Sequence, residues 1–237
     1  LLACALLVAA SGLAATPCAA KLIEQQRWVA AKAIDRYGKE VARDIMVTVF
    51  YDDTAPQPYP LLILNHGRAP QSAERRAMGR AAYREASRWF AGMGFMVAVP
   101  TRIGYGVTGG EDVEDTGACT RKDYPPGYAA AAAQTLTVLD YLRGWKEVAK
   151  DRTVIVGQSF GGTTAITIAA MNTPGVQATI NFAGGGGGDP KGHPGQPCAQ
   201  PQLKQLFADY GKTARIPTLW IYSENDLYMG PTLPRVW

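Results

Sequence analysis

The sequence has few charged residues, and its basic residues do not gather anywhere along the chain. Charged residues make up 19% of the 237 residues, and the net charge is only +4. No run of Lys and Arg indicates binding to nucleic acid or to an anionic lipid surface. We therefore interpret these residues as a solvated surface, and we expect no nucleic-acid partner.

Metal-binding patterns, internal repeats and long linkers are also missing. The four cysteines show neither CxxC nor Cys/His spacing, which argues against a zinc site. Hydrophobic residues make up 47% of the chain, enough for one medium-sized domain with its own core. We expect a single domain over residues 21–237. Nothing in the sequence indicates an oligomeric state.

The first twenty residues carry no charge. Residues 1–10 are almost purely apolar, and residues 11–20 are mostly small and include Pro17. This pattern is typical of the later part of a secretory signal peptide, with cleavage after Gly12 or Ala20. It is shorter than the roughly 20 apolar residues of a membrane span. We expect a secreted or periplasmic protein whose N-terminus is clipped; the alternative is a buried N-terminal helix.

Short apolar segments alternate with helical stretches along the rest of the chain, and residues 21–37 read as a peripheral helix or an irregular lead-in. The expected strands are residues 41–51, 61–64, 95–99, 153–156, 176–182 and 217–222, and the expected helices are 72–92, 127–143, 161–171 and 202–210. This alternation predicts an α/β fold, a doubly wound, mostly parallel sheet with helices on both faces. Ligands bind such sheets beyond the carboxyl ends of the strands.

The strongest motif is Gly157-Gln158-Ser159-Phe160-Gly161, which follows a β-branched run and precedes a helix. A strand–turn–helix of this kind holds the serine in a strained conformation that exposes its hydroxyl. Gly157 and Gly161 are needed because side chains at these positions would collide in the turn. Ser159 is therefore the candidate nucleophile; the alternative is a glycine-rich turn with an incidental serine.

Two backbone N–H groups must converge on the oxyanion of a tetrahedral intermediate. The first is predicted to be that of Phe160, the residue after the nucleophile. The second is predicted to be that of Arg68, in Asn65-His66-Gly67-Arg68 at the end of an earlier strand. Gly67 permits the close approach. We interpret His66 as a structural residue that braces this loop, in preference to a general base.

An acidic residue follows the last expected strand. In hydrolases whose nucleophilic serine lies in such a strand–turn–helix, the three catalytic residues occur along the chain in the order serine, acid, histidine. Asp226 fits the acid that orients an imidazole, and Glu224 is its rival. A helix cap or a solvated turn is the structural alternative.

Four segments resemble the dienelactone hydrolase-like branch of the α/β-hydrolase superfamily, namely residues 65–67, 157–162, 181–185 and 220–226. The resemblance covers most of the chain from about residue 41. It implies hydrolysis of a carboxylic ester or related acyl bond of a small molecule, with no metal or cofactor. Authentic dienelactone hydrolases carry Cys as nucleophile where this chain has Ser159, so the resemblance favours an esterase-like role over hydrolysis of dienelactone itself.

The sequence contains only two histidines, His66 and His193. His193 lies in the loop 184–201, before the acid in chain order, which argues against it as the base. We expect the catalytic histidine, with a last strand and helix, outside these residues. This fragment is then expected to be weakly active or inactive.

Other interpretations stay open. The same fold also supports acyltransferases and peptidases, and a non-catalytic binding protein that lost the base is a third possibility. Arg102, Tyr105 and the acidic loop 111–115 follow a strand and could contact substrate, although a structural pairing of Arg102 with a nearby acid is the simpler interpretation. Cys119 and Cys198 could form a disulfide or stay as free thiols.

Overall fold

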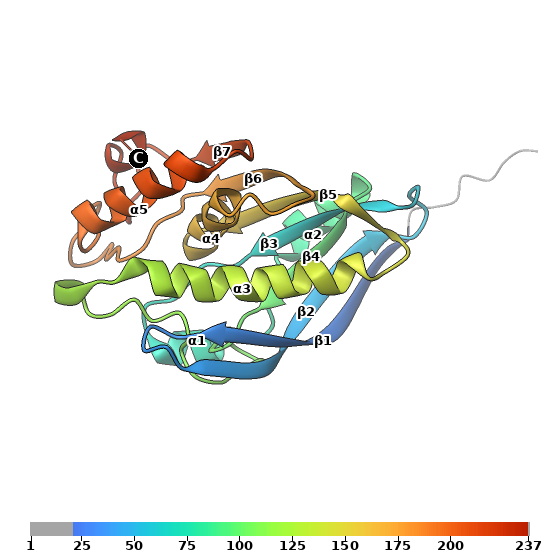
Figure 1. Ribbon diagram of the computed structural model, residues 1–237, viewed down its shortest axis with the longest axis horizontal. Coiled ribbons are helices and arrows are strands. Elements are labelled where there is room, and N and C mark those ends of the chain that lie inside the picture. Colours follow the sequence, from blue (N-terminus) through green and yellow to red (C-terminus); the bar gives the residue numbers. More distant parts are fainter. Residues whose placement is uncertain (1–20, 237) are drawn as a thin grey trace, which may run out of the picture.

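The computed structural model describes residues 21–236. The predicted signal segment, residues 1–20, lies outside the described residues. Within them the chain forms one mixed sheet with helices packed on both of its faces (Figure 1). The predicted doubly wound, mostly parallel α/β fold is confirmed.

Seven strands form the sheet, in the order β1-β2-β4-β3-β5-β6-β7. The pairs β1–β2 and β2–β4 are antiparallel, and every other neighbouring pair is parallel. The strands are β1 (Leu22–Ile34), β2 (Glu40–Asp52), β3 (Tyr59–Asn65), β4 (Met96–Thr101), β5 (Val148–Gln158), β6 (Val176–Phe182) and β7 (Thr218–Ile221).

The helices divide between the two faces. They are α1 (Ser72–Ala77), α2 (Arg84–Gly92), α3 (Tyr124–Arg143), α4 (Phe160–Ala170) and α5 (Gln200–Thr213), with short 3-10 turns at Cys119–Arg121 and Leu233–Val236. On one face α3 and α4 cover the sheet through Leu139 and Ile168, packed against Ile63 and Ile155. On the other face α2 packs through Ala91. Because both faces are covered, the central strands are apolar almost throughout, as parallel strands should be.

The expectation for residues 21–37 was wrong: most of this segment is the edge strand β1. Its side chains alternate between exposed and buried, with Val29, Ala31 and Ala33 facing the core. Along its length β1 pairs with β2. The alternation of buried and exposed residues that is typical of a strand was not evident in the sequence, because alanine is only weakly hydrophobic. Such a residue identifies the buried face only once the partner strand is known.

The single helix expected over residues 72–92 was also wrong. The segment contains two short helices, α1 and α2, separated by residues 78–83. Gly79 has φ +72° and Tyr83 has φ +42°, both in the left-handed region that interrupts a helix. Helix α3, in contrast, begins three residues earlier than expected. Its first turn holds two prolines, which is permitted because N–H groups there have no helical partner.

A disulfide joins Cys119 to Cys198, with their Cα atoms 5.2 Å apart. It ties the turn before α3 to the loop before α5, across 79 residues of sequence. The pairing that the sequence left open is therefore present in the structure.

We predict that replacing both Cys119 and Cys198 with Ser lowers the free energy of unfolding by about 2–5 kcal/mol, because the unfolded chain regains the entropy of a long open loop. Urea unfolding followed by far-UV circular dichroism measures this change. Wild-type protein treated with a thiol reductant should behave as the double variant does. Equal stability of the oxidised and reduced proteins would contradict the prediction.

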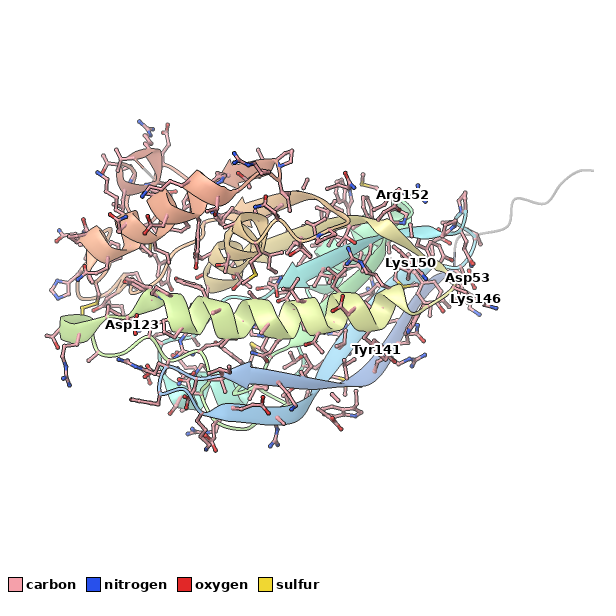
Figure 2. All side chains as sticks on the ribbon, viewed as in Figure 1. Asp53, Asp123, Tyr141, Lys146, Lys150 and Arg152 are labelled. Atoms are coloured by element: carbon pink, nitrogen blue, oxygen red, sulfur yellow. A yellow bond between two sulfur atoms is a disulfide. The ribbon has the colours of Figure 1, made fainter. Side chains whose placement is uncertain are left out.

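Residues 21–236 include no helix that is both long enough and apolar enough to cross a bilayer. Tyr141, Lys146 and Lys150 lie around the start of β5, at the end of the sheet away from the carboxyl ends of the parallel strands (Figure 2). The predicted site residues lie at the other end, as the topology requires.

Candidate active site

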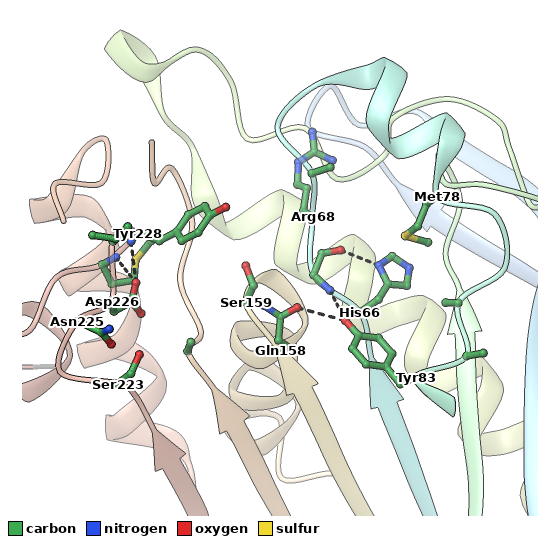
Figure 3. A pocket seen from close by; sticks show the side chains of 17 residues that line it. His66, Arg68, Met78, Tyr83, Gln158, Ser159, Ser223, Asn225, Asp226 and Tyr228 are labelled. Atoms are coloured by element: carbon green, nitrogen blue, oxygen red, sulfur yellow. Dashed lines mark hydrogen bonds between the residues drawn. The ribbon is translucent and has the colours of Figure 1, made fainter. Parts of the chain in front are cut away.

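Ser159 occupies the turn between β5 and α4. Its backbone has φ 55° and ψ −123°, a conformation that a residue with a side chain rarely adopts. The Ser159 N–H donates to the Phe182 carbonyl on β6 (2.9 Å), and the Ser159 carbonyl accepts from the N–H of Gly162 (2.8 Å). Neighbouring backbone thus holds the strained residue, and its hydroxyl points into a cleft (Figure 3).

The turn closes only because glycines surround it. A Cβ on Gly157 would lie 1.9 Å from the Gly161 carbonyl oxygen, and a Cβ on Gly161 would lie 2.3 Å from the Asn65 carbonyl oxygen. The second contact joins the turn to the end of β3. The geometry therefore brings the two predicted oxyanion segments, residues 65–68 and 158–160, into direct contact.

The backbone N–H groups of the two predicted oxyanion donors make no hydrogen bond within the described residues, 21–236. Phe160 is the first residue of α4, where a backbone N–H has no partner within the helix. Neither its N–H nor that of Arg68 donates to another residue within 21–236. The partial positive charge at the start of α4 also favours an anion at this position.

His66 is buried, and both of its ring nitrogens make hydrogen bonds. Nδ1 lies 2.7 Å from the Gly67 carbonyl oxygen, and Nε2 accepts the Arg102 N–H at 3.3 Å. These partners require a neutral ring with its proton on Nδ1. Burial, followed by the nearby Arg102 guanidinium, lowers the pKa of His66 well below its usual value. This geometry supports the predicted bracing role.

A depressed pKa for His66 makes stability depend on pH. The unfolded chain takes up a proton near pH 6.5 while the folded chain does not, so this contribution is present above pH 6.5 and is lost as the pH falls. We predict that His66→Asn removes up to about 1.4 kcal/mol per pH unit from the slope of unfolding free energy between pH 6.5 and 5. Urea titrations at several pH values measure the slope; equal slopes in the two proteins would refute the prediction.

A fully buried ion pair lies beneath the loop that carries His66. Glu114 accepts from Arg102 and from the Tyr105 hydroxyl, the latter at 2.6 Å, and Arg102 also donates to the His66 carbonyl at 3.0 Å. Both charged side chains have no exposed surface. The structural interpretation of Arg102 is supported, since its guanidinium is used within the protein.

We predict that Glu114→Gln lowers the unfolding free energy by about 3–5 kcal/mol, because it leaves the Arg102 charge buried without a partner. The double variant Arg102→Met, Glu114→Leu should be less destabilised than Glu114→Gln, since no unpaired charge remains. Thermal and urea unfolding compare the three proteins. A double variant less stable than the single one would show that charge pairing is not the cause.

The Arg68 side chain is mostly buried between the loop and its neighbours, with 15% of its surface exposed. Its guanidinium makes a bidentate ion pair with Asp112, at 2.7 and 2.6 Å, and Arg75 donates to the same carboxylate at 2.7 Å. The two arginines hold the pKa of Asp112 below its usual value, although burial opposes them. The Arg68 side chain is thus fixed by Asp112, while its backbone N–H remains available.

Asp226 lies in the loop after β7. Its Oδ1 accepts the backbone N–H groups of Tyr228 (2.7 Å) and Met229 (3.0 Å). No hydrogen bond from residues 21–236 reaches its Oδ2, which leaves one oxygen for an imidazole. The side chain of Glu224, the rival acid, is 93% exposed, and its Oε1 lies 3.9 Å from an Arg235 guanidinium nitrogen. Glu224 does not line the cleft.

The cleft encloses about 720 Å³ and brings Ser159 and Asp226 together (Figure 3). His66, Gly67 and Arg68 line it on the side opposite Asp226. His193 is exposed, lies outside the cleft, and pairs through its backbone with Asp189. The residues described here therefore place a hydroxyl and a carboxylate on one cleft, and the imidazole in its wall, that of His66, has both ring nitrogens engaged in other hydrogen bonds.

Sequence reasoning missed several residues of the cleft. Tyr83, Gln158, Tyr228 and Met229 also line it. A smaller cavity of about 210 Å³ adjoins Ser159 and is lined in part by the glycines at 185–188. Gln158 is part of the serine motif, so its place at the cleft could have been predicted from the sequence. Tyr83 was not, because only the break between α1 and α2 brings it to the cleft.

The chain is similar in sequence to one protein family and in fold to several solved structures. A model of the dienelactone hydrolase family matches residues 76–228. The structure is similar to acetyl xylan esterases from Paenibacillus sp. R4 and Thermoanaerobacterium sp. JW/SL YS485, with TM-scores of 0.57 for both. Identities are 16% and 15%, and the alignments cover 91% and 92% of this chain and 78% and 77% of those chains.

An acylaminoacyl peptidase from Pyrococcus horikoshii is also similar, with a TM-score of 0.57 and 16% identity over 88% of this chain and 33% of that chain. No curated protein matches the sequence. At these identities the structural matches establish a shared α/β-hydrolase fold. The family model spans more than half of the chain, so the chain belongs to the dienelactone hydrolase family of hydrolases.

Proposed function

We propose that this protein is a serine hydrolase that cleaves a carboxylic ester of a small molecule through an acyl-enzyme. The observation that carries the proposal is the backbone of Ser159, which is strained at a strand–helix turn and aims its hydroxyl into the cleft shared with Asp226. Strain of this kind persists at functional sites because the surrounding structure holds it.

In the proposed reaction the Ser159 oxygen attacks the ester carbonyl, and its proton passes to an imidazole. The N–H groups of Phe160 and Arg68 donate to the oxyanion that forms. The imidazolium then protonates the departing alcohol, leaving an ester of Ser159. A water attacks this ester, releases the acid and restores the serine.

The Asp226 carboxylate would orient the imidazole and stabilise its charged form through Oδ2. Neither histidine of the sequence fits this role, because His66 uses both ring nitrogens and His193 lies outside the cleft. We propose that the imidazole comes from a residue outside these 237. The coding sequence beyond Trp237 tests this point, since the proposal requires a histidine there within about 30–50 residues.

A fluorophosphonate probe tests the nucleophile. It should label the full-length protein at Ser159, as read by peptide mass spectrometry, and Ser159→Ala should not be labelled. An unlabelled wild-type protein, together with unchanged p-nitrophenyl acetate turnover in Ser159→Ala, would refute the assignment.

We also propose that the protein is exported to the periplasm or the medium. The apolar segment at residues 1–20 and the disulfide between Cys119 and Cys198 support this, because disulfides persist in oxidising compartments. Fractionation of cells that express the full-length gene should recover the protein outside the cytoplasm. Recovery of the reduced protein in the cytoplasm alone would contradict export.

A further inference from the structure

We propose that Tyr83 is a positioning residue that fixes the separation of the two oxyanion donors. The inference rests on the proposed function, because it concerns the same reaction. The donors belong to two segments far apart in sequence, residues 65–68 and 158–160. An oxyanion hole works only if both N–H groups are held in advance at hydrogen-bond distance from one oxygen.

The Tyr83 hydroxyl joins these two segments directly. It accepts the Gly67 N–H at 3.4 Å and donates to Oε1 of Gln158 at 3.2 Å (Figure 3). Gly67 precedes one predicted donor, Arg68. Gln158 precedes Ser159, whose neighbour Phe160 supplies the other. A single phenol therefore bridges the residues that flank the oxyanion site.

The segments that Tyr83 joins are already in close contact. A Cβ on Gly67 would lie 2.8 Å from the Gln158 Oε1 and 3.2 Å from the Ser159 Cβ. There is no spare room between the segments, so a small movement of one changes its contact with the other. The bridge through Tyr83 thus sets a separation on which both the nucleophile and the oxyanion donors depend.

Tyr83 is itself held in a strained conformation. Its φ of 42° and ψ of 50° are left-handed, and it stands at the start of α2, where its carbonyl accepts the Ser87 N–H at 2.8 Å. Ser159 and Ala183, which also line the cleft, have positive φ as well. Such strain in residues with side chains points to a geometry maintained for function.

The strain at Tyr83 is offset by the backbone just before it. The Ala81 N–H donates to the Thr101 hydroxyl on β4 at 2.9 Å, and the Ala81 carbonyl accepts from the Thr48 hydroxyl on β2 at 2.8 Å. The Ala82 carbonyl accepts from the Ser87 hydroxyl at 2.7 Å. Two central strands therefore anchor the segment that presents the phenol.

The phenol also keeps its proton. Burial raises the pKa of Tyr83, and the Gly67 N–H and the Arg102 charge oppose this only in part. The neutral hydroxyl can accept from Gly67 and donate to Gln158 at the same time. This is the protonation state that the bridge requires.

The test compares Tyr83→Phe with Tyr141→Phe in the full-length protein. Tyr141 is 38% exposed and Tyr83 is 37% exposed, and Tyr141 lies on α3 away from the cleft (Figure 2). For Tyr83→Phe we expect kcat to fall about 10- to 100-fold, with KM changed by less than about twofold, because a donor displaced by the lost bridge acts mainly in the transition state. Tyr141→Phe should match the wild type.

Two further measurements separate positioning from a general loss of structure. The dissociation constant of a phenylboronic acid, which mimics the tetrahedral state, should rise by the factor by which kcat/KM falls. Gln158→Met removes the other end of the bridge, and the double variant with Tyr83→Phe should be no worse than either single one. An unchanged kcat, an unchanged boronate affinity or additive effects would overturn the proposal. Failure of the wild-type protein to react with a fluorophosphonate would instead refute the proposed function.

Discussion

Replacing Ser159 with alanine is expected to reduce ester hydrolysis by the full-length protein about 10⁶-fold, the loss that follows removal of the nucleophile from a hydroxyl–imidazole–carboxylate unit. A rate about 10³- to 10⁴-fold above that in water should remain, because the oxyanion donors and the cleft still bind the substrate. Steady-state turnover of p-nitrophenyl acetate measures both quantities.

The matched control for this change is Ser72→Ala. Ser72 begins α1 and is exposed, and it does not line the cleft. The Ser72→Ala protein should hydrolyse the ester at the wild-type rate. Both variants should unfold at the temperature of the wild type, since Ser72 is exposed and alanine at position 159 keeps the backbone hydrogen bonds of that residue. A Ser159→Ala protein with more than about a tenth of wild-type activity would rule out covalent catalysis by this residue.

Added imidazole is expected to restore hydrolysis to the chain of 237 residues. Its cleft of about 720 Å³ is lined by Ser159 and Asp226, and the His66 ring in the cleft wall has both nitrogens engaged in other hydrogen bonds. A small base that enters it could take the serine proton while the free oxygen of Asp226 orients the ring. We expect a saturable increase of about 10- to 100-fold, a part of the 10²- to 10⁴-fold that a fixed general base supplies.

Imidazole also cleaves activated esters by itself, so the prediction concerns the difference between proteins. The increase should be absent from Ser159→Ala and strongly reduced in Asp226→Asn, which still fills the site but cannot stabilise an imidazolium. It should be present above about pH 7, where the added imidazole is neutral. Equal increases in all three proteins would show that the cleft does not assemble this unit.

The part of the site that the sequence predicted most completely is built from neighbouring residues. The Ser159 turn needs only the strand before it, the glycines around it and the helix after it, and all of these are local. Strand β6 likewise occupies the predicted residues 176–182, because a short apolar run between turns has few alternatives.

The parts that the sequence did not predict depend on contacts between distant segments. Strand β1 is stabilised by pairing with β2 along its length. This pairing makes it a strand although its own hydrophobic pattern is weak. The role of Tyr83 follows from a left-handed backbone that Thr48 and Thr101 hold in place from two other strands. Nor does the sequence show that Glu114, among several acids in its loop, is the partner of Arg102.

In the proposed reaction the ester's acyl group passes to Ser159. The most direct measurement mixes the full-length protein with p-nitrophenyl acetate, stops the reaction with acid within the first turnover, and weighs the intact protein and its peptides. We expect one acetyl group, located on Ser159 and absent from Ser159→Ala. Turnover by the wild-type protein with no acetyl group on Ser159 at any time, or with the acetyl group on another residue, would contradict it.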